Sequence, residues 1–159
     1  MATLLAKMDL IKRYTLLMLS RRGYDTTITE STDTITRIGN VLIVFVPDSK
    51  VSIATIKFIL ATRIDNELVV VVHAKKLTSD ARNKILADTN IETFTFEEMS
   101  FDLLDIIPMH TRVTPVPLEW KRLPVLLKSD AAVRYFGFKP KEVIKIVEDD
   151  ATISYRRVC

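Results

Sequence analysis

Two runs of apolar, mostly β-branched residues constrain the fold of this chain more than any other feature. The first is VLIVFV at residues 41–46, and the second is VVVV within ELVVVVH at residues 67–73. Because neither run alternates with polar residues, each predicts a strand that is covered on both faces. A helical stripe lies between them, formed by Ile53, Ile56, Leu60 and Ile64. This strand–helix–strand order predicts α/β layers with at least partly parallel pairing.

The chain before the first run supplies a helix and a hairpin partner. The spacing of apolar residues predicts a helix over residues 3–22, followed by Gly23 as a left-handed cap. Its apolar stripe consists of Leu4, Met8, Ile11, Tyr14 and Met18. Residues 32–38 are rich in β-branched residues, and Gly39-Asn40 separates them from residues 41–46, which predicts a hairpin.

After the second run, the pattern alternates once more and then changes. Thr78 and Ser79 are suited to cap a short helix through Asp88, and residues 91–96 read as a further strand. The next segment is turn-rich, because it holds four prolines, Pro108, Pro115, Pro117 and Pro124.

We therefore expect two domains, an α/β domain over residues 1–104 and a small mixed-sheet α+β domain over residues 105–159. The second domain should contain a short helix opened by Ser129-Asp130. Two strands should follow it, at 143–147 and 153–158, joined by an acidic turn.

Composition excludes several classes of protein. Hydrophobic residues make up 48% and charged residues 27%, which argues for a folded core rather than disorder. The single cysteine, Cys159, allows no internal disulfide, and no stretch approaches the roughly 18 apolar residues that span a bilayer. The net charge is +3, and residues 1–104, with 13 basic and 13 acidic side chains, contribute none of it. We expect an intracellular protein without a membrane segment.

Residues suited to catalysis are few. The chain holds two histidines, His73 and His110, and neither has a second histidine or a cysteine at metal-ligand spacing. Pro47-Asp48 after a strand resembles the start of the metal site of restriction-type nucleases, in which a second acid and a lysine follow on the next strand. Here Lys75 is present, the second acid is missing, and Glu67 lies at the opposite end of that strand. We expect no catalytic residues, metal, cofactor or small-molecule ligand, and a nuclease remains the alternative.

Residues 122–158 contain four motifs in a fixed order. They are Arg122-Leu123-Pro124, Asp130-Ala131-Ala132-Val133-Arg134-Tyr135-Phe136-Gly137-Phe138-Lys139, Val143-Ile144-Lys145-Ile146-Val147 and Ile153-Ser154-Tyr155-Arg156. This series resembles the C-terminal domain of the fifth-subunit family of nuclear and archaeal RNA polymerases. That family has a Leu-Pro, an Ala-Arg-Tyr-Phe-Gly-Leu-Lys run, a Val-Val-Lys-Ile-Ile-like strand and a closing Tyr-Arg. Upstream, Pro108-Met109-His110 matches a Pro-x-His.

The first half resembles the nuclear members more weakly. The matching segments are Arg21-Arg22-Gly23-Tyr24, residues 51–57 and residues 77–81. Lys141 stands where the family has a glycine, and Ser79 where it has a proline. Two segments are also trimmed, between the first helix and the hairpin and between His110 and Leu123. Such divergence is typical of a copy encoded by a large DNA virus.

The resemblance implies a non-catalytic polymerase subunit. Its C-terminal domain would dock on the largest subunit. Its N-terminal domain would have an α/β fold similar to that of restriction-type endonucleases and would form a jaw beside downstream double-stranded DNA. The implied interface with the largest subunit comprises Pro108, His110, Pro124, Arg134, Tyr135, Phe136, Gly137, Lys139, Lys145, Tyr155 and Arg156. The implied DNA-proximal residues are Lys75, Lys76, Thr78 and Ser79.

Several alternatives remain open at this point. Tyr135 and Phe136 fit either interface anchors or core residues at helical spacing, and Lys145 fits a snorkelling residue of an edge strand. A free-standing adaptor for transcription factors is a third functional class. A viral copy would act in the host cytoplasm and virion, and a cellular one in the nucleus.

Overall fold

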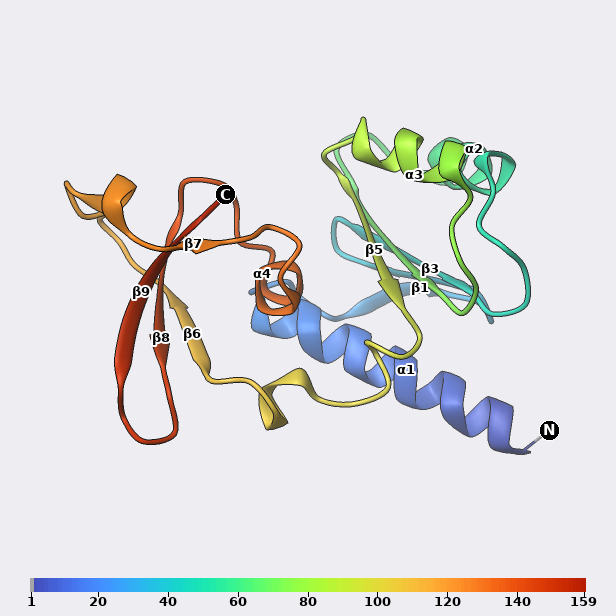
Figure 1. The fold of residues 1–159 in the computed structure, drawn as a ribbon. Helices are drawn as coiled ribbons and strands as arrows, with labels where there is room; N and C mark the ends of the chain where they lie inside the picture. Colours follow the sequence, from blue (N-terminus) through green and yellow to red (C-terminus); the bar gives the residue numbers. More distant parts are fainter. Residues whose placement is uncertain (1) are drawn as a thin grey trace. The chain divides into compact units, whose positions relative to one another are not determined.

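In the computed structural model, the chain forms two compact units, Met1–Phe101 and Asp102–Cys159. The structure describes residues 2–159, and it describes side chains from residue 5 onward, so Leu4 lies outside the described side chains. Each unit is a mixed α/β structure with its own mixed sheet (Figure 1).

The N-terminal unit is built on a five-stranded sheet with the order β1-β2-β3-β4-β5. The strands are β1 Ile28–Ser31, β2 Ile35–Ile38, β3 Val41–Val46, β4 Leu68–His73 and β5 Ile91–Thr95. β1, β2 and β3 pair antiparallel, whereas β3, β4 and β5 pair parallel. The hairpin and the parallel pairing predicted from the sequence are both confirmed.

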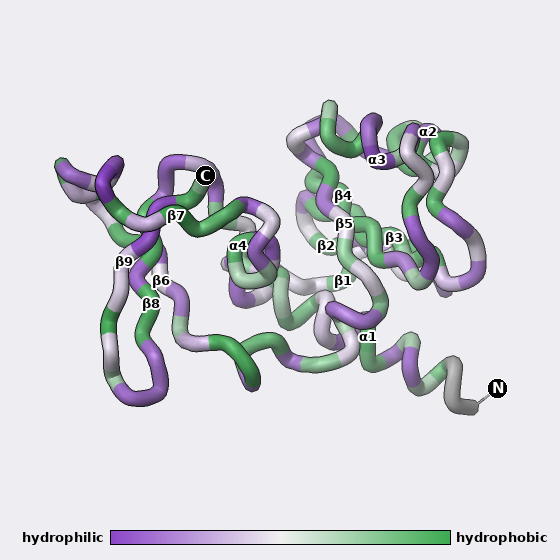
Figure 2. The backbone as a smooth tube through the Cα atoms, in the orientation of Figure 1, coloured by the Kyte–Doolittle hydropathy of each residue, from purple (hydrophilic) through white to green (hydrophobic). Residues whose placement is uncertain are grey.

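Helices cover both faces of this sheet. Helix α1 (Ala2–Arg21) lies on one face, and α2 (Ile53–Thr62) and α3 (Ser79–Leu86) lie on the other (Figure 1). All six residues of β3 are buried, as are five of the six in β4, and Figure 2 shows these central strands in the colour of apolar residues. The two apolar runs are therefore buried strands, as the lack of alternation predicted.

The helix ends follow local sequence signals. Ser52 caps α2 in a capping box with Thr55, and Thr78 caps α3 by accepting a hydrogen bond from the amide of Ala81. Gly23 follows α1 at φ +90°, a backbone conformation that favours glycine.

Two predictions about this unit need correction. Ile64 was placed on the helical stripe of α2, but the helix ends at Thr62 and Ile64 is 61% exposed. Strand β1 was not predicted, because all four of its residues are exposed and nothing in their pattern indicates a buried face.

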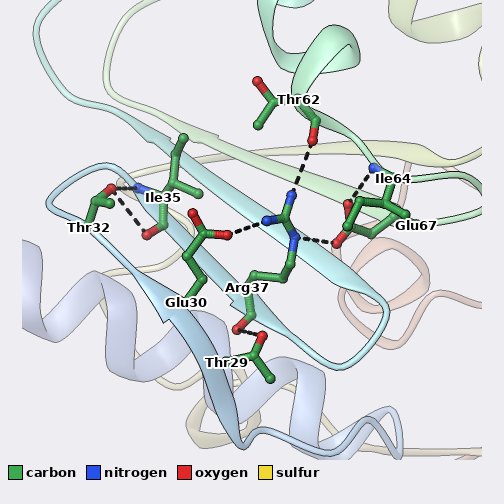
Figure 3. A network of polar contacts seen from close by, with 8 residues as sticks. All are labelled: Thr29, Glu30, Thr32, Ile35, Arg37, Thr62, Ile64 and Glu67. Carbon is green, nitrogen blue, oxygen red and sulfur yellow. Dashed lines mark hydrogen bonds and ion pairs between the residues drawn. The ribbon is translucent and has the colours of Figure 1, made fainter.

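A partly buried ion-pair network joins β2 to the segment between α2 and β4 (Figure 3). The Arg37 Nε donates to Glu67 Oε1 at 2.7 Å, and its Nη2 donates to the carbonyl of Thr62 at 3.2 Å. The amide of Ile64 donates to the second oxygen of Glu67 at 3.0 Å, and Glu30 pairs with Arg37 from the exposed side. Hydrogen bonding to Glu67 holds the pKa of Arg37 above its ordinary value. Glu67, which is 1% exposed, therefore has a structural partner.

The C-terminal unit contains a four-stranded sheet with the order β6-β8-β9-β7. Its elements are η1 Leu103–Asp105, β6 Met109–Arg112, η2 Trp120–Arg122, β7 Val125–Leu126, α4 Ala131–Phe136, β8 Val143–Val147 and β9 Ile153–Val158. β6, β8 and β9 pair antiparallel, and the short β7 pairs parallel with β9. The helix and the two long strands lie where the sequence predicted them, whereas β6 and β7 were read only as extended, turn-rich chain.

Helix α4 packs on one face of this sheet, and the hydrophobic core of the unit lies between them. Asp130 caps the helix start by accepting from the amide of Ala132, and Gly137 ends it at φ +66°. The buried core consists of Leu126, Val133, Phe138, Ile144, Ile146 and Val158, with Phe136 packed against it. Among the described residues, no helix combines the length and the apolar character needed to cross a membrane.

The network around Arg37 gives a stability prediction. Replacing Glu67 with Ala leaves the guanidinium of Arg37 partly buried without its inner partner, so the free energy of unfolding should fall by about 3 kcal/mol. The matched control is Glu30→Ala, which removes the exposed partner of the same guanidinium and should cost about 0.5 kcal/mol. Equal losses in chemical denaturation would contradict the assignment of Glu67 as the main anchor.

Candidate assembly surface

An aromatic cluster fixes α4 against the sheet of the C-terminal unit. The ring of Phe136 stacks with that of Phe138 at 5.3 Å between centroids and meets the edge of Tyr135 at 5.2 Å. His110 of β6 also stacks with Phe136, at 6.4 Å between centroids. The Nδ1 of His110 is 2.7 Å from the carbonyl of Pro108, which orients the imidazole. The Pro-x-His and the Tyr-Phe-Gly segments therefore meet in one packed cluster.

A second layer of contacts surrounds the loop after α4. The guanidinium of Arg112 lies over the ring of Phe138 at 5.5 Å and pairs with Glu142 at 2.8 Å. Glu142 also accepts a hydrogen bond from the amide of Lys139 at 2.7 Å. These contacts hold the turn between α4 and β8, which includes Lys141 at φ +75°. The glycine that the family has at this position would adopt that conformation more readily.

The strand register divides the predicted interface residues between the two faces of the sheet. Residues that are paired directly across antiparallel strands share a face. His110 pairs with Ile146, and Arg156 pairs with Ile144, so His110 and Arg156 lie on the face covered by α4. Lys145 pairs with Tyr155 and Thr111, so these residues lie on the opposite face.

This opposite face, which we call the open face, carries exposed apolar side chains. Met109 is 65% exposed, Ile153 50% and Tyr155 42%. Directly paired residues form three rows across it, Met109–Val147–Ile153, Thr111–Lys145–Tyr155 and Val143–Arg157–Val125. Val143 in the third row is buried, so the accessible part of the face lies in the first two rows and at Val125.

The remaining predicted interface residues lie around α4 and the proline-rich segment. Tyr135 is 4% exposed, whereas Arg134, Phe136 and Gly137 are half-buried. Pro124 and Lys139 are exposed in loops, and Pro108 is half-buried. Lys145 is not on an edge strand as one alternative had it, because β8 lies between β6 and β9.

Sequence reasoning missed most of the open face. Met109, Ile153, Val125 and Arg157 belong to it, and none of them was among the predicted interface residues, although Met109 and Ile153 lie within the matched motifs. The available signal was the hairpin of β8 and β9, whose acidic turn at residues 148–150 fixes the pairing of Lys145 with Tyr155. The contributions of β6 and β7 carry no local signal, because both strands are short and pair with distant segments.

The N-terminal unit brings together the residues considered for a nuclease or for DNA contact. Lys75 Nζ donates to the backbone carbonyl of Asp48 at 2.6 Å, so the two residues are neighbours at the carboxyl ends of β4 and β3. His73 lies where a nuclease has its second acid, and its Nδ1 is 2.7 Å from the carbonyl of Lys75. Glu67 lies at the other end of β4 and is paired with Arg37.

Residues Lys76, Thr78 and Ser79 follow directly. Lys76 and Ser79 are exposed, while the hydroxyl of Thr78 is used in capping α3. Within the described residues, no three side chains of His, Cys, Asp or Glu converge in a way that could hold a metal ion.

Comparison with known families identifies the C-terminal unit. Residues 113–158 match the family model described as RNA polymerase Rpb5, C-terminal domain. By this match, the C-terminal unit is similar to the Rpb5 C-terminal domain over residues 113–158. The match covers α4 and strands β7, β8 and β9, and it confirms the resemblance seen in the sequence.

Two relatives extend the comparison beyond the Rpb5 domain. The chain is 28% identical over 97 residues to "Uncharacterized protein 028R" of Frog virus 3 (isolate Goorha), which covers 53% of this chain and 56% of the relative. It is 28% identical over 124 residues to "DNA-directed RNA polymerase V subunit 5C" of Arabidopsis thaliana, which covers 67% of this chain and 52% of the relative. The chain thus spans about half the length of the curated relatives it matches.

The arrangement at Asp48 gives a prediction about catalysis. A nuclease of the restriction type needs two carboxylates to hold its divalent metal, and only Asp48 is in place beside Lys75. The purified chain should therefore leave plasmid DNA intact in Mg²⁺ or Mn²⁺. Cleavage that is abolished by Asp48→Ala, and retained by the nearby control Lys50→Ala, would overturn this expectation.

Proposed function

We propose that the chain is a non-catalytic subunit of a multisubunit DNA-directed RNA polymerase. The observation that carries this proposal is the match of residues 113–158 to the Rpb5 C-terminal domain. The similarity to a polymerase V subunit of Arabidopsis thaliana also supports it, over a longer part of the chain. In this proposal the nucleotidyl-transfer chemistry resides in the large subunits.

The C-terminal unit is the assembly domain in this proposal and docks on the largest subunit. Two features support this role: α4 covers one face of its sheet, and the other face, the open face, exposes Met109, Ile153 and Tyr155. Exposed apolar patches of this kind mark protein interaction sites. Helix α4, with Arg134 in its last turn, forms the other candidate contact.

The N-terminal unit acts as a jaw of endonuclease-like fold that lies beside downstream duplex DNA. Its mixed sheet with helices on both faces is compatible with that fold, and the missing second carboxylate suits a scaffold without catalysis. Lys75 and Lys76 at the carboxyl end of β4, with Thr78 and Ser79 after them, would contact phosphates without reading sequence.

The compartment in which the protein acts is inferred from this proposed role and not from the fold. The similarity to a frog virus protein favours a viral polymerase, which would act in the host cytoplasm and be carried in the virion. A cellular polymerase would act in the nucleus. The alternative of a free-standing adaptor differs in stoichiometry, because an adaptor would not be a fixed component of purified polymerase.

Docking can be tested with Arg134→Glu in the tagged full chain. Affinity purification of the wild type at moderate salt should recover two very large polymerase subunits in stoichiometric amounts. Arg134→Glu places a carboxylate at the end of α4 and should reduce their recovery at least tenfold, a change of about 1.4 kcal/mol. Recovery of the wild type without large subunits would refute the polymerase assignment.

The matched control for this test is Lys128→Glu, which reverses a charge at an exposed position before α4. It should leave recovery unchanged. Circular dichroism of both variants checks that each chain remains folded. Normal recovery of Arg134→Glu with a folded chain would remove α4 from the docking surface.

The jaw proposal predicts a change in salt dependence. Replacing both Lys75 and Lys76 with Ala removes up to two phosphate contacts, so the slope of log K against log salt for duplex binding by the assembled polymerase should decrease by up to about 2. Assembly itself should be unaffected. The control pair Lys50→Ala and Lys57→Ala removes two exposed lysines of the same unit. An unchanged slope for the Lys75 and Lys76 variant would contradict a DNA contact at this loop.

A further inference from the structure

The open face of the C-terminal sheet has a defined chemical pattern. Its middle row places Lys145 between Thr111 and Tyr155, and its first row consists of Met109, Val147 and Ile153. A cation is thus bordered by apolar side chains on a surface that the described part of the chain leaves largely uncovered. On this sheet, α4 and its aromatic cluster pack on the opposite face.

The charges on this face are of one sign. Lys145 and Arg157 are its charged residues, and none of the residues in its three rows is acidic. Within the described residues, neither cation forms an ion pair. Arg157 donates through Nε to the backbone carbonyl of Leu123 at 3.1 Å and through Nη1 to the Sγ of Cys159 at 2.7 Å. The nearest carboxylates along the strands are Glu142, which precedes β8 and pairs with Arg112, and those of the turn at residues 148–150.

From this pattern we infer that the open face binds a polypeptide segment of a large polymerase subunit in which an acidic side chain is flanked by apolar ones. The acid would pair with Lys145, and the apolar neighbours would cover Met109 and Ile153 on one side and Tyr155 on the other. This inference rests on the proposed function and specifies the chemistry of the partner.

The chemistry of the face disfavours two other occupants. A second copy of this chain related by a two-fold axis would bring the same cationic face against itself, which opposes association. Duplex DNA needs several phosphate contacts for measurable affinity at physiological salt. The face offers two cations among exposed apolar side chains, so a polypeptide with both apolar and acidic groups matches it better.

The experiment is affinity purification of the tagged full chain carrying single substitutions on the open face. Lys145→Glu should reduce recovery of the large subunits about tenfold or more, because it places like charges in contact. Ile153→Glu should do the same by adding a charge to the apolar row. Lys145→Arg keeps the charge and should retain wild-type recovery, whereas Lys145→Met keeps the apolar stem alone and should lose recovery.

Lys128→Glu again serves as the charge-matched control away from the open face, and thermal melting checks that every variant is folded. If the wild type recovers no large subunits, the proposed function fails and this inference fails with it. If the wild type recovers them and folded Lys145→Glu does so equally well, the inference alone is overturned.

The other occupants give distinct results. Light scattering that shows a wild-type dimer dissociated by Lys145→Glu would assign the face to a second copy. Loss of duplex binding by the purified chain in the same variant would assign it to nucleic acid. Either result would overturn the inference of a polypeptide segment.

Discussion

The parallel pairing of β3 with β4 is the constraint on which the N-terminal unit depends. Both strands are apolar along nearly their whole length, so both faces of the sheet must be covered. Helix α1 covers one face, and α2 and α3 cover the other (Figure 1). Because helices cover both faces of the sheet, the surfaces of this unit that remain accessible to a ligand are the strand ends and the loops that follow them. That is where Asp48 and Lys75 meet.

The C-terminal unit differs, because α4 covers one face of its sheet while the other face is buried only in part, at Val143. Ile144, Ile146 and Val158 of β8 and β9 are buried in the core, and α4 with its aromatic cluster packs on that face. The second face keeps apolar side chains exposed around Lys145. A scaffold with two covered faces and a module with one open face fit the proposed division between a jaw and an assembly domain. The family match falls on the module with the open face.

Elements with a continuous run of apolar residues or a clear turn signal were predicted from the sequence, and elements without either signal were missed. Residues 41–46 and the β8–β9 hairpin were placed well, because apolar content and turn residues are local signals. β1 and β6 were missed, because their residues are mostly exposed. The partner of β6, strand β8, is also distant in the sequence. The role of Glu67 was also out of reach, since its partner Arg37 is 30 residues away in the sequence.

For the candidate site, the sequence indicated which residues to consider but not whether each lies in the interior or on the open face of the sheet. The family resemblance selected Tyr135, Lys145 and Tyr155 together, but the structure places the first in the interior and the other two on the open face. The register of the β8–β9 hairpin puts Lys145 and Tyr155 on one face, and the packing of α4 on the opposite face buries Tyr135.

The most direct test of the account is lysine-specific crosslinking of the assembled polymerase, followed by mass spectrometry. If the C-terminal unit is the assembly domain, crosslinks to the largest subunit should start from lysines beside its sheet, such as Lys128 and Lys139, which are exposed. Lysines of the N-terminal unit, such as Lys57, should contribute few of them. Crosslinks to the largest subunit that start only from the N-terminal unit would contradict the account.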